Sequence, residues 1–326
     1  MSSVSLLMLV VMAQCAVTQG IETQVSETQW PEDPSGIQQE IEYPSLDDRP
    51  TTQIGSTSPF ENASFDADTS GVDVPLPSVQ FTVTHLPKFG SKGFGANSLE
   101  LRQSYLLGYG ELPPLTITPG AAIHFWTGPT DLDLPPRVYD AFVDLQWNLW
   151  KTEKSSLVLG ATPGLYGDYK LVDHRTFQWS GWFVGSRHLT ENWTVLGGVA
   201  YLRQLRSNWL PLGGAIWTPN SSTRFELLFP RPRLSRLWVS NGKWNGWGYL
   251  GGQFGGGAWS VADTSETNVS VGYSDLRLIG GYETISNTGL ECRAELGYVF
   301  ARELTVNDTA VFSPSGTMVA QISFAF

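Results

Sequence analysis

From about Ser78 to the end of the chain, apolar and polar residues alternate in successive blocks that are separated by Gly, Pro, Asn and Asp. In the clearest block, residues 290–300, the apolar positions are interleaved with Glu291, Arg293 and Glu295. Side chains of a β-strand point alternately to opposite faces, unlike those of a helix, so the pattern predicts strands with one apolar and one polar face. The predicted strands are 79–86, 98–109, 115–126, 138–150, 156–167, 176–188, 193–203, 210–217, 222–229, 234–240, 244–259, 268–284, 289–300 and 316–326.

The connections between these strands are of two kinds. Long connections mostly alternate with short ones, and only the 230–233 corner is shorter than its place in the series predicts. Short turns at one rim and long loops at the other are typical of outer-membrane barrels. We therefore predict an all-β fold, a closed antiparallel transmembrane β-barrel of 14 strands, or of 12 if residues 222–240 form a loop. The long connections are 87–97, 127–137, 168–175, 204–209, 260–267 and 301–315; the short ones are 110–114, 151–155, 189–192, 218–221, 241–243 and 285–288.

Two local features refine the predicted strands. Asn241-Gly242 has the composition of a two-residue hairpin turn. The alternation within 268–284 changes phase between Tyr273 and Leu276, which predicts a β-bulge near Asp275. Both features concern the turns and the register and leave the expected strand count unchanged.

Hydrophobicity and aromatic residues favour a membrane barrel. After the N-terminal segment no run of about 18 apolar residues occurs, which excludes a transmembrane helix. A closed barrel is the other structure that can span lipid, because closure pairs every backbone polar group. A soluble β-sandwich with its aromatic rings in the core is the alternative. Tryptophans near the strand ends predict two interfacial girdles: Trp126, Trp209 and Trp259 at the long loops, and Trp147, Trp150, Trp193, Trp217 and Trp244 at the short turns.

The polar faces of the strands are expected to line the lumen. An Arg on the lipid face at mid-depth would cost roughly 2–4 kcal/mol, so the strand phase must turn the charges inward. Because both signs are present, we expect charge ladders in a wet interior without a strong preference for anions or cations. The expected lumen-lining residues are Glu100, Arg102, Asp140, Asp144, Arg224, Glu226, Asp275, Arg277, Glu291, Arg293 and Glu295.

The first 77 residues have a different character. An apolar run, Val4–Met12, is followed by small residues, so residues 1–19 are expected to be a signal peptide that exports the chain. Residues 20–77 are rich in Thr, Ser, Gln, Pro and acids and are expected to form a disordered arm. Twelve of the 31 acidic residues lie in this arm, but only one of the 20 basic residues. The barrel is therefore electrically balanced, and it offers no basic patch for a nucleic acid.

Cysteine is scarce in this chain. Cys15 lies in the expected signal peptide, which leaves Cys292 alone in the mature protein, so no internal disulfide is expected. A lipidated Cys15 is an alternative to the signal peptide, and Gln14 disfavours the cleavage that it requires.

The last strand carries a resemblance. Alternating apolar residues ending in an aromatic are similar to the C-terminal assembly signal of bacterial outer-membrane proteins. That resemblance implies insertion by the barrel-assembly machinery, a location in the bacterial outer membrane, and contact with outer-membrane lipid. The residues that match the signal are Met318, Ala320, Ile322, Phe324 and Phe326.

A longer part of the chain, about 78–326, resembles an uncharacterised family of putative outer-membrane β-barrels. The match is carried by Ile216–Asn220 and the following Arg224–Pro230. The resemblance implies no substrate and no catalytic residue. Barrels that import aromatic hydrocarbons or fatty acids are a looser likeness, because an N-terminal plug is not evident here.

Several motifs admit a catalytic or binding interpretation, and a structural one is stronger for each. The segment 246–251 matches the GxGxxG pattern of dinucleotide folds, but the glycines that follow it exclude the required helix. His85, His124, His174 and His188 lack metal-ligand spacing, and His124 is expected beside Asp140 or Asp144. Arginines at 224, 231, 233 and 236 suggest an anion site at one mouth, although a charged rim is the ordinary interpretation.

These observations predict a pore or transport channel for small solutes, with no catalytic residues, cofactor or metal. A structural or surface-interaction barrel with a filled lumen is the second hypothesis, in which loops 127–137 and 301–315 bind an external partner. An enzyme is the third, and it requires a His, an Asp and a hydroxyl within hydrogen-bond reach in the lumen. The acidic arm is expected to bind a periplasmic partner or to act as a spacer.

Overall fold

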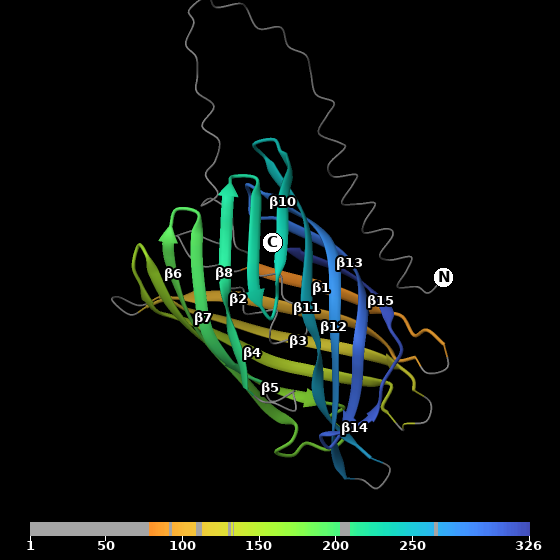
Figure 1. Ribbon diagram of the computed structural model, residues 1–326. Coiled ribbons are helices and arrows are strands. Elements are labelled where there is room, and N and C mark those ends of the chain that lie inside the picture. The colour runs from red at the N-terminus through yellow and green to blue at the C-terminus, as the bar shows by residue number, and fades with distance from the viewer. Residues whose placement is uncertain are drawn as a thin grey trace, which may run out of the picture. The chain divides into compact units, whose positions relative to one another are not determined.

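The computed structural model describes residues 78–90, 93–108, 113–129, 132, 134–202, 209–263 and 267–326 (Figure 1). The expected signal peptide and acidic arm lie outside the described residues. In these ranges no helix is long and apolar enough to cross a membrane. The strands are β1 (Ser78–Leu86), β2 (Gly95–Leu107), β3 (Leu115–Thr127), β4 (Arg137–Lys151), β5 (Ser155–Gly167), β6 (Phe177–Thr190), β7 (Trp193–Tyr201), β8 (Trp209–Asn220), β9 (Thr223–Phe229), β10 (Arg233–Ser240), β11 (Trp244–Ala262), β12 (Asn268–Ser286), β13 (Glu291–Val306), β14 (Thr309–Phe312) and β15 (Thr317–Ala325).

Fourteen of these strands form a closed antiparallel ring. Each strand from β1 to β13 pairs with the next one in the sequence, and β15 pairs with both β13 and β1. The prediction of a 14-stranded closed barrel is confirmed, and the sandwich is excluded because the sheet has no open layers (Figure 1). The 12-stranded alternative is wrong, since residues 222–240 contain β9 and β10 and these strands pair with each other.

The connection predicted over residues 301–315 is largely wrong. The strand β13 continues to Val306, and the extra strand β14 folds back on it outside the ring. The reason is that β12 already begins at Asn268, so its first residues need a partner strand, which the extension of β13 provides. The remaining loop spans residues 313–316.

A β-bulge interrupts the pairing of β12 with β13. The register shifts between Ser274 and Leu276, at the position predicted from the sequence. The extra residue lies on β13, however, where Ala301 has a φ of 49°, and β12 keeps Tyr273, Asp275 and Arg277 on one face. The predicted change of phase within β12 is therefore wrong, although the predicted place of the bulge is right.

The two rims differ as expected. We call the rim with the connections after β2, β4, β6, β8, β10 and β12 the short-turn rim, and the opposite one the long-loop rim. After β10 the central residues of the turn are Gly242 and Lys243, one position later than predicted, because Asn241 N–H donates to the carbonyl of Trp244. Both ends of the barrel lie at the short-turn rim, where Val79 and Phe326 exchange two backbone hydrogen bonds.

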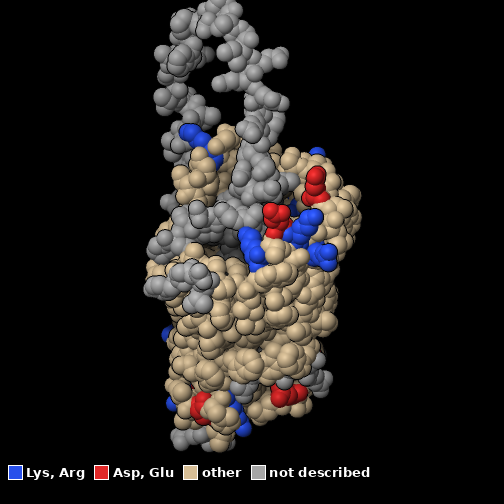
Figure 2. Space-filling model, turned by 90° about the vertical axis from the view of Figure 1, so that its left-hand side faces the viewer, with Lys and Arg blue, Asp and Glu red and all other residues tan. Residues whose placement is uncertain are grey.

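The outer face of the ring is apolar. Leucines on several strands have more than half of their surface exposed, whereas the residues next to them in sequence are buried or half-buried. Figure 2 shows, on the side where β6 and β7 lie, charged residues gathered toward the two ends with a broad uncharged band between them. An exposed apolar band around a closed sheet is stable only in lipid. Examples of these exposed leucines are Leu101, Leu227, Leu250, Leu278 and Leu296.

Aromatic residues form two clusters on the outer face of β6–β9. Trp193 stacks on Trp217 near the short-turn rim, and Tyr201 contacts Trp179 and Trp209 near the long-loop rim. Eight residues separate Trp209 from Trp217 along β8, which corresponds to about 27 Å of strand and about 20 Å of membrane depth at a tilt of about 40°. This spacing fits two girdles around an apolar band of about 25 Å.

The prediction is wrong for two of the tryptophans that it assigned to the girdle at the long loops. Trp126 and Trp259 are buried inside the barrel, with ring centroids 5.1 Å apart and the rings nearly perpendicular. The physical reason is strand phase, because Trp126 has the same parity as His124 on β3 and therefore shares its inward face. Proximity to a strand end does not decide which side of the wall a ring occupies.

The strand β11 divides the interior. It pairs with β10 only as far as Gly251, and near its other end Ser260 forms a parallel bridge with Gly167 of β5. At the long-loop rim, nine strands (β11–β13, β15 and β1–β5) therefore form a smaller closed ring. The strands β6–β10 complete the full circumference outside this smaller ring.

The packing of the interior follows the same division. One apolar cluster, the ring core, is built by residues of the nine-stranded ring and its loops, and includes Phe94, Trp126, Val138, Trp259 and Leu304. A second cluster, the side cluster, comes from β6–β9, with Phe254 of β11 packed against it, and includes Val184, Leu196, Leu212, Ile216 and Leu228. Thus β11 has packed side chains on both of its faces toward the long-loop rim.

Candidate functional site in the barrel interior

All the residues expected to line the lumen lie on the faces of their strands opposite to the exposed apolar side chains. None of them has more than 14% of its side chain exposed. Each takes part in an ion pair or a hydrogen bond with another interior side chain. Their pairs are Glu100–Arg102, Arg102–Asp144, His124–Asp140, Arg224–Glu226, Asp275–Arg277, Glu291–Arg293 and Tyr249–Glu295.

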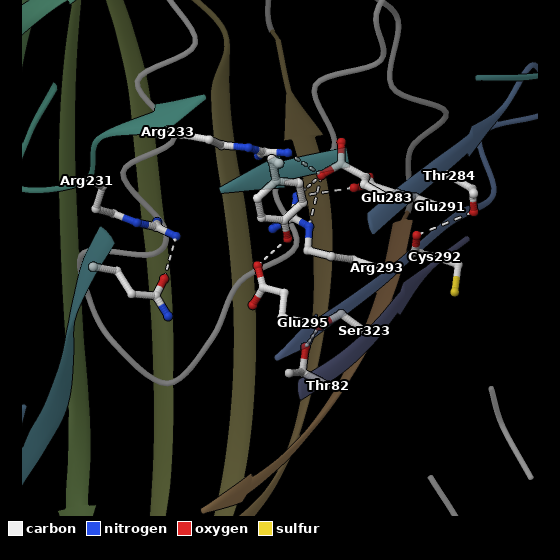
Figure 3. A network of polar contacts seen from close by, with 12 residues as sticks. Thr82, Arg231, Arg233, Glu283, Thr284, Glu291, Cys292, Arg293, Glu295 and Ser323 are labelled. Atoms are coloured by element: carbon white, nitrogen blue, oxygen red, sulfur yellow. Dashed lines mark hydrogen bonds and ion pairs between the residues drawn. The ribbon is translucent and has the colours of Figure 1, made fainter. Parts of the chain in front are cut away.

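Glu283 of β12 is the centre of a network of polar contacts (Figure 3). Its Oε2 accepts hydrogen bonds from Arg233 Nη2 of β10 at 3.0 Å and from Arg293 Nε of β13 at 3.0 Å. The Arg293 Nη2 atom also lies 3.4 Å from Glu291 Oε1. One carboxylate thus joins three strands, and each guanidinium is held close to a negative charge.

Tyr249 of β11 connects this network to a second carboxylate. Its hydroxyl donates to Glu295 of β13, and the Arg233 guanidinium lies 3.8 Å above its ring centroid. Close by, Arg231 Nη2 donates to Gln253 Oε1 at 3.2 Å. Tyr249 thus contacts charged groups in two ways, through its hydroxyl and through the face of its ring. In the sequence it occupies a position that could equally hold an apolar residue.

A second network lies on β2, β3 and β4. Arg102 is hydrogen-bonded to Glu100 on its own strand and to Asp144 two strands away, and its guanidinium lies 4.6 Å from the Phe142 ring centroid. Gly120 of β3 lies between these strands. A Cβ at Gly120 would be 2.5 Å from the Phe142 ring, so the missing side chain is what lets the network cross β3.

His124 and Asp140 meet inside the nine-stranded ring, as the sequence suggested. His124 Nε2 lies 2.9 Å from Asp140 Oδ2, and Trp259 Nε1 donates to the other oxygen, Oδ1, at 2.7 Å. Within the described ranges no hydroxyl is hydrogen-bonded to His124. The arrangement therefore supplies the His and the Asp of the enzyme hypothesis and lacks its nucleophile in this structure.

Sequence reasoning missed Arg302, which lies in the segment predicted to be a loop. Its buried guanidinium donates to the Tyr273 hydroxyl at 2.8 Å, to the Ser315 carbonyl at 2.9 Å and to the Phe94 carbonyl at 2.6 Å. It also missed Glu283, although Glu283 has the same parity along β12 as Arg277. Parity within the predicted strand 268–284 would have found Glu283, whereas the bulge at Ala301 reverses the parity of β13 before Arg302, so alternation alone would have placed Arg302 on the wrong face.

Exposure of the inward-facing side chains rises toward the short-turn rim on one side of the barrel. Along β4, Val138 is 0%, Asp140 4% and Phe142 7% exposed, and the next three inward positions, Asp144, Gln146 and Asn148, are half-buried. The inward residues of β2 and β3 change in the same direction. The inward side chains are therefore less completely buried near the short-turn rim than in the ring core toward the long-loop rim.

The residues of the expected assembly signal share one parity on β15. Met318 and Phe326 are exposed, Ala320 and Phe324 are half-buried, and Ile322 is buried, while Gln321 and Ser323 point to the other face. Their contact with an assembly machinery remains a prediction.

The other motifs have structural roles. The GxGxxG segment lies within β11. Among the described residues no group of three or more His, Cys, Asp or Glu is arranged to hold a metal ion. Of the four clustered arginines, Arg224 and Arg233 are paired with carboxylates in the interior and Arg236 is exposed, so they form no common anion site.

The closed ring, its apolar outer band and its polar interior together define a transmembrane β-barrel of the outer-membrane type. No protein-family model matches the sequence, and no curated protein aligns with it. The segment 216–230 therefore gains no family match.

Several solved structures are similar in fold. The KdgM porin covers 76% of this chain and 98% of its own, with 7% identity and a TM-score of 0.36. An outer membrane channel from Pseudomonas putida F1 covers 78% and 98%, with 13% identity and a TM-score of 0.35. LpxR from Salmonella typhimurium covers 76% and 99%, with 9% identity and a TM-score of 0.38. Likenesses of this size carry no argument about function, and the assignment of the barrel depends on its own geometry.

Proposed function

We propose that this chain is a bacterial outer-membrane channel for small solutes, exported by residues 1–19 and inserted by the barrel-assembly machinery through residues 318–326. The observation that carries the proposal is the gradient of exposure along the inward faces of β2–β4. In this proposal, water enters from the short-turn rim and hydrates the half-buried inward side chains near it, such as Gln146. A ring of about eight strands is filled by its own side chains, and one of about 16 encloses an aqueous channel, so 14 strands have room for a partly hydrated bore.

In this proposal the ring core is the barrier to passage. Trp126 and Trp259 lie across the bore between β3 and β11, and Phe94 packs against Trp126 with ring centroids 5.8 Å apart. Solutes enter at the short-turn rim and pass when these rings separate. The interior pairs acids with bases, so we expect weak selectivity between anions and cations.

Ion flux through the purified full-length protein in planar lipid bilayers tests the channel. We expect short bursts of conductance for the native protein and several-fold more current for Trp259→Ala, which removes a ring from the barrier. Trp209→Ala is the matched control, because it removes an indole that is 63% exposed on the outer face, and it should leave the current unchanged. Absence of current in both the native protein and Trp259→Ala would refute the channel.

A second candidate function is favoured by one observation, the packed ring core. Val138, Val299 and Leu304 have no exposed surface, as in a barrel that serves only as a scaffold. In that case the loops, including residues 128–136, would bind an external partner and the bore would stay closed. The bilayer experiment separates the two functions, because a scaffold conducts in none of the variants.

A further inference from the structure

A backbone contact between β5 and β11 closes the nine-stranded ring, and side-chain hydrogen bonds such as that from Trp259 to Asp140 accompany it. Beyond Gly251, β11 has left β10, and its edge reaches β5 at Ser260 and Gly167. The Asp168 N–H donates to the Ser260 carbonyl at 3.2 Å, and the Ala262 N–H donates to Asp168 Oδ2 at 3.2 Å. We call the set of these four residues the β5–β11 contact: Gly167, Asp168, Ser260 and Ala262.

Position 167 must be a glycine because of this contact, since its backbone conformation alone would allow other residues. Its φ is not positive, so other residues could adopt the same backbone angles. A Cβ at this position, however, would lie 2.3 Å from the Ser260 carbonyl oxygen and 3.3 Å from the carbonyl carbon. Because the obstacle is backbone, no change of rotamer could relieve it. Any larger residue at 167 must separate β5 from β11.

The size of the ring depends on this contact. Barrel diameter grows roughly in proportion to strand number, and a ring of about eight strands is just filled by side chains. The ring core consists of residues from the nine-stranded ring and its loops, as a small, filled barrel requires. Without the contact, the circumference at the long-loop rim would include β6–β10 and reach fourteen strands. The same side chains could not fill that larger bore.

We infer that the β5–β11 contact is a latch that holds the long-loop half of the bore shut, and that its release opens the channel. This inference rests on the proposed function. The latch would regulate opening of that same bore, and its residues come from two strands that are far apart in the sequence.

Polar atoms in the latch and beside it would gain hydrogen-bond partners on opening. The Ser260 hydroxyl is buried, and in the described part of the chain it has no hydrogen-bond partner. The side-chain oxygen of Gln178 on β6 is in the same condition, while its Nε2 donates to the Ala258 carbonyl at 3.2 Å. A buried polar atom without a partner destabilises the state that buries it. Water entering the open latch would hydrate both atoms and so favour release.

A thiol at the latch reports its opening without any reference to conductance. The test protein is full-length Cys292→Ser with Ser260→Cys, reconstituted in lipid, and the probe is a charged, water-soluble maleimide. Adding Gly167→Ala should increase the labelling rate by about tenfold or more, because the closed state can no longer form without a clash. Asp168→Ala, which removes the acceptor for Ala262, should act in the same direction. Gly197→Ala is the control, since a Cβ there meets nothing within 4 Å.

The outcomes of this test separate the latch from the channel. Faster labelling together with higher current in Gly167→Ala supports both. Faster labelling without current supports the latch and refutes the channel. Labelling that stays at the Gly197→Ala rate in both latch variants, in protein whose gel mobility still changes on boiling, would overturn the latch whatever the current does.

Discussion

The network around Glu283 allows a quantitative prediction of stability. Replacing Glu283 by Gln keeps the shape of the side chain and removes the charge that Arg233 and Arg293 share. Glu283 has 5% of its side chain exposed, and its Oε2 accepts from both guanidiniums at 3.0 Å. After the substitution, two positive charges remain inside the barrel without their common carboxylate.

The magnitude follows from the burial of each partner. Breaking a buried ion pair by removing one member costs about 3–5 kcal/mol, because the remaining charge stays desolvated. Arg293 keeps Glu291 at 3.4 Å, and Arg233 has 23% of its side chain exposed, so both retain part of their stabilisation. We therefore expect Glu283→Gln to lower the free energy of unfolding by about 3 kcal/mol, the lower end of that range.

The assay is urea unfolding of the barrel in lipid vesicles, followed by tryptophan fluorescence. Glu191→Gln makes the same chemical change in an exposed short turn and should shift the unfolding free energy by less than about 0.5 kcal/mol. A double-mutant cycle with Arg233→Gln should show coupling, because each substitution removes part of the same interaction. Equal unfolding midpoints for Glu283→Gln and Glu191→Gln would refute the reasoning.

Three further predictions concern the wall of the barrel. Leu278→Arg places a charge on the lipid face near the middle of β12 and should destabilise the barrel by about 2–4 kcal/mol in the same assay; no change would contradict the orientation of that strand. Ala301→Gly should stabilise it by about 1 kcal/mol, because Ala301 has a φ of 49°, and a loss of stability would argue against the bulge. Phe326→Ala should slow assembly, measured as the heat-modifiable fraction over time, and leave the unfolding midpoint of the assembled barrel unchanged. Equal assembly rates would contradict the assembly signal.

Strand alternation predicted the ring, and the strand ends show why it could not predict everything. A strand that separates lipid from a polar interior must alternate, so all 14 strands of the ring were identified from their pattern. The extension of β13 was missed because Ala301 shifts the register and interrupts the alternation. The contact of Gly167 with Ser260 was missed because it joins two backbones and leaves no periodic trace in side chains.

The charged residues of the interior could be identified from parity, but their partners could not. Arg233 and Glu283 lie on strands separated by β11, so their contact depends on the stagger of three strands. Sequence alone also does not show that the rings of Trp126 and Trp259 meet across the bore, since that requires the position of β11 relative to β3. Which residues face inward is a local property, whereas their pairing is a property of the closed ring.

Ring closure also constrains the order of folding. The Thr82 hydroxyl donates to the Ser323 hydroxyl at 3.1 Å across 241 positions of sequence, and β1 pairs with β15 along its length (Figure 3). Joining such distant segments is entropically costly and slow. This contact cannot form before β15 has been synthesised, so until then the chain presents unpaired strand edges. Before closure, those edges can pair with other chains, and closing the ring removes this hazard.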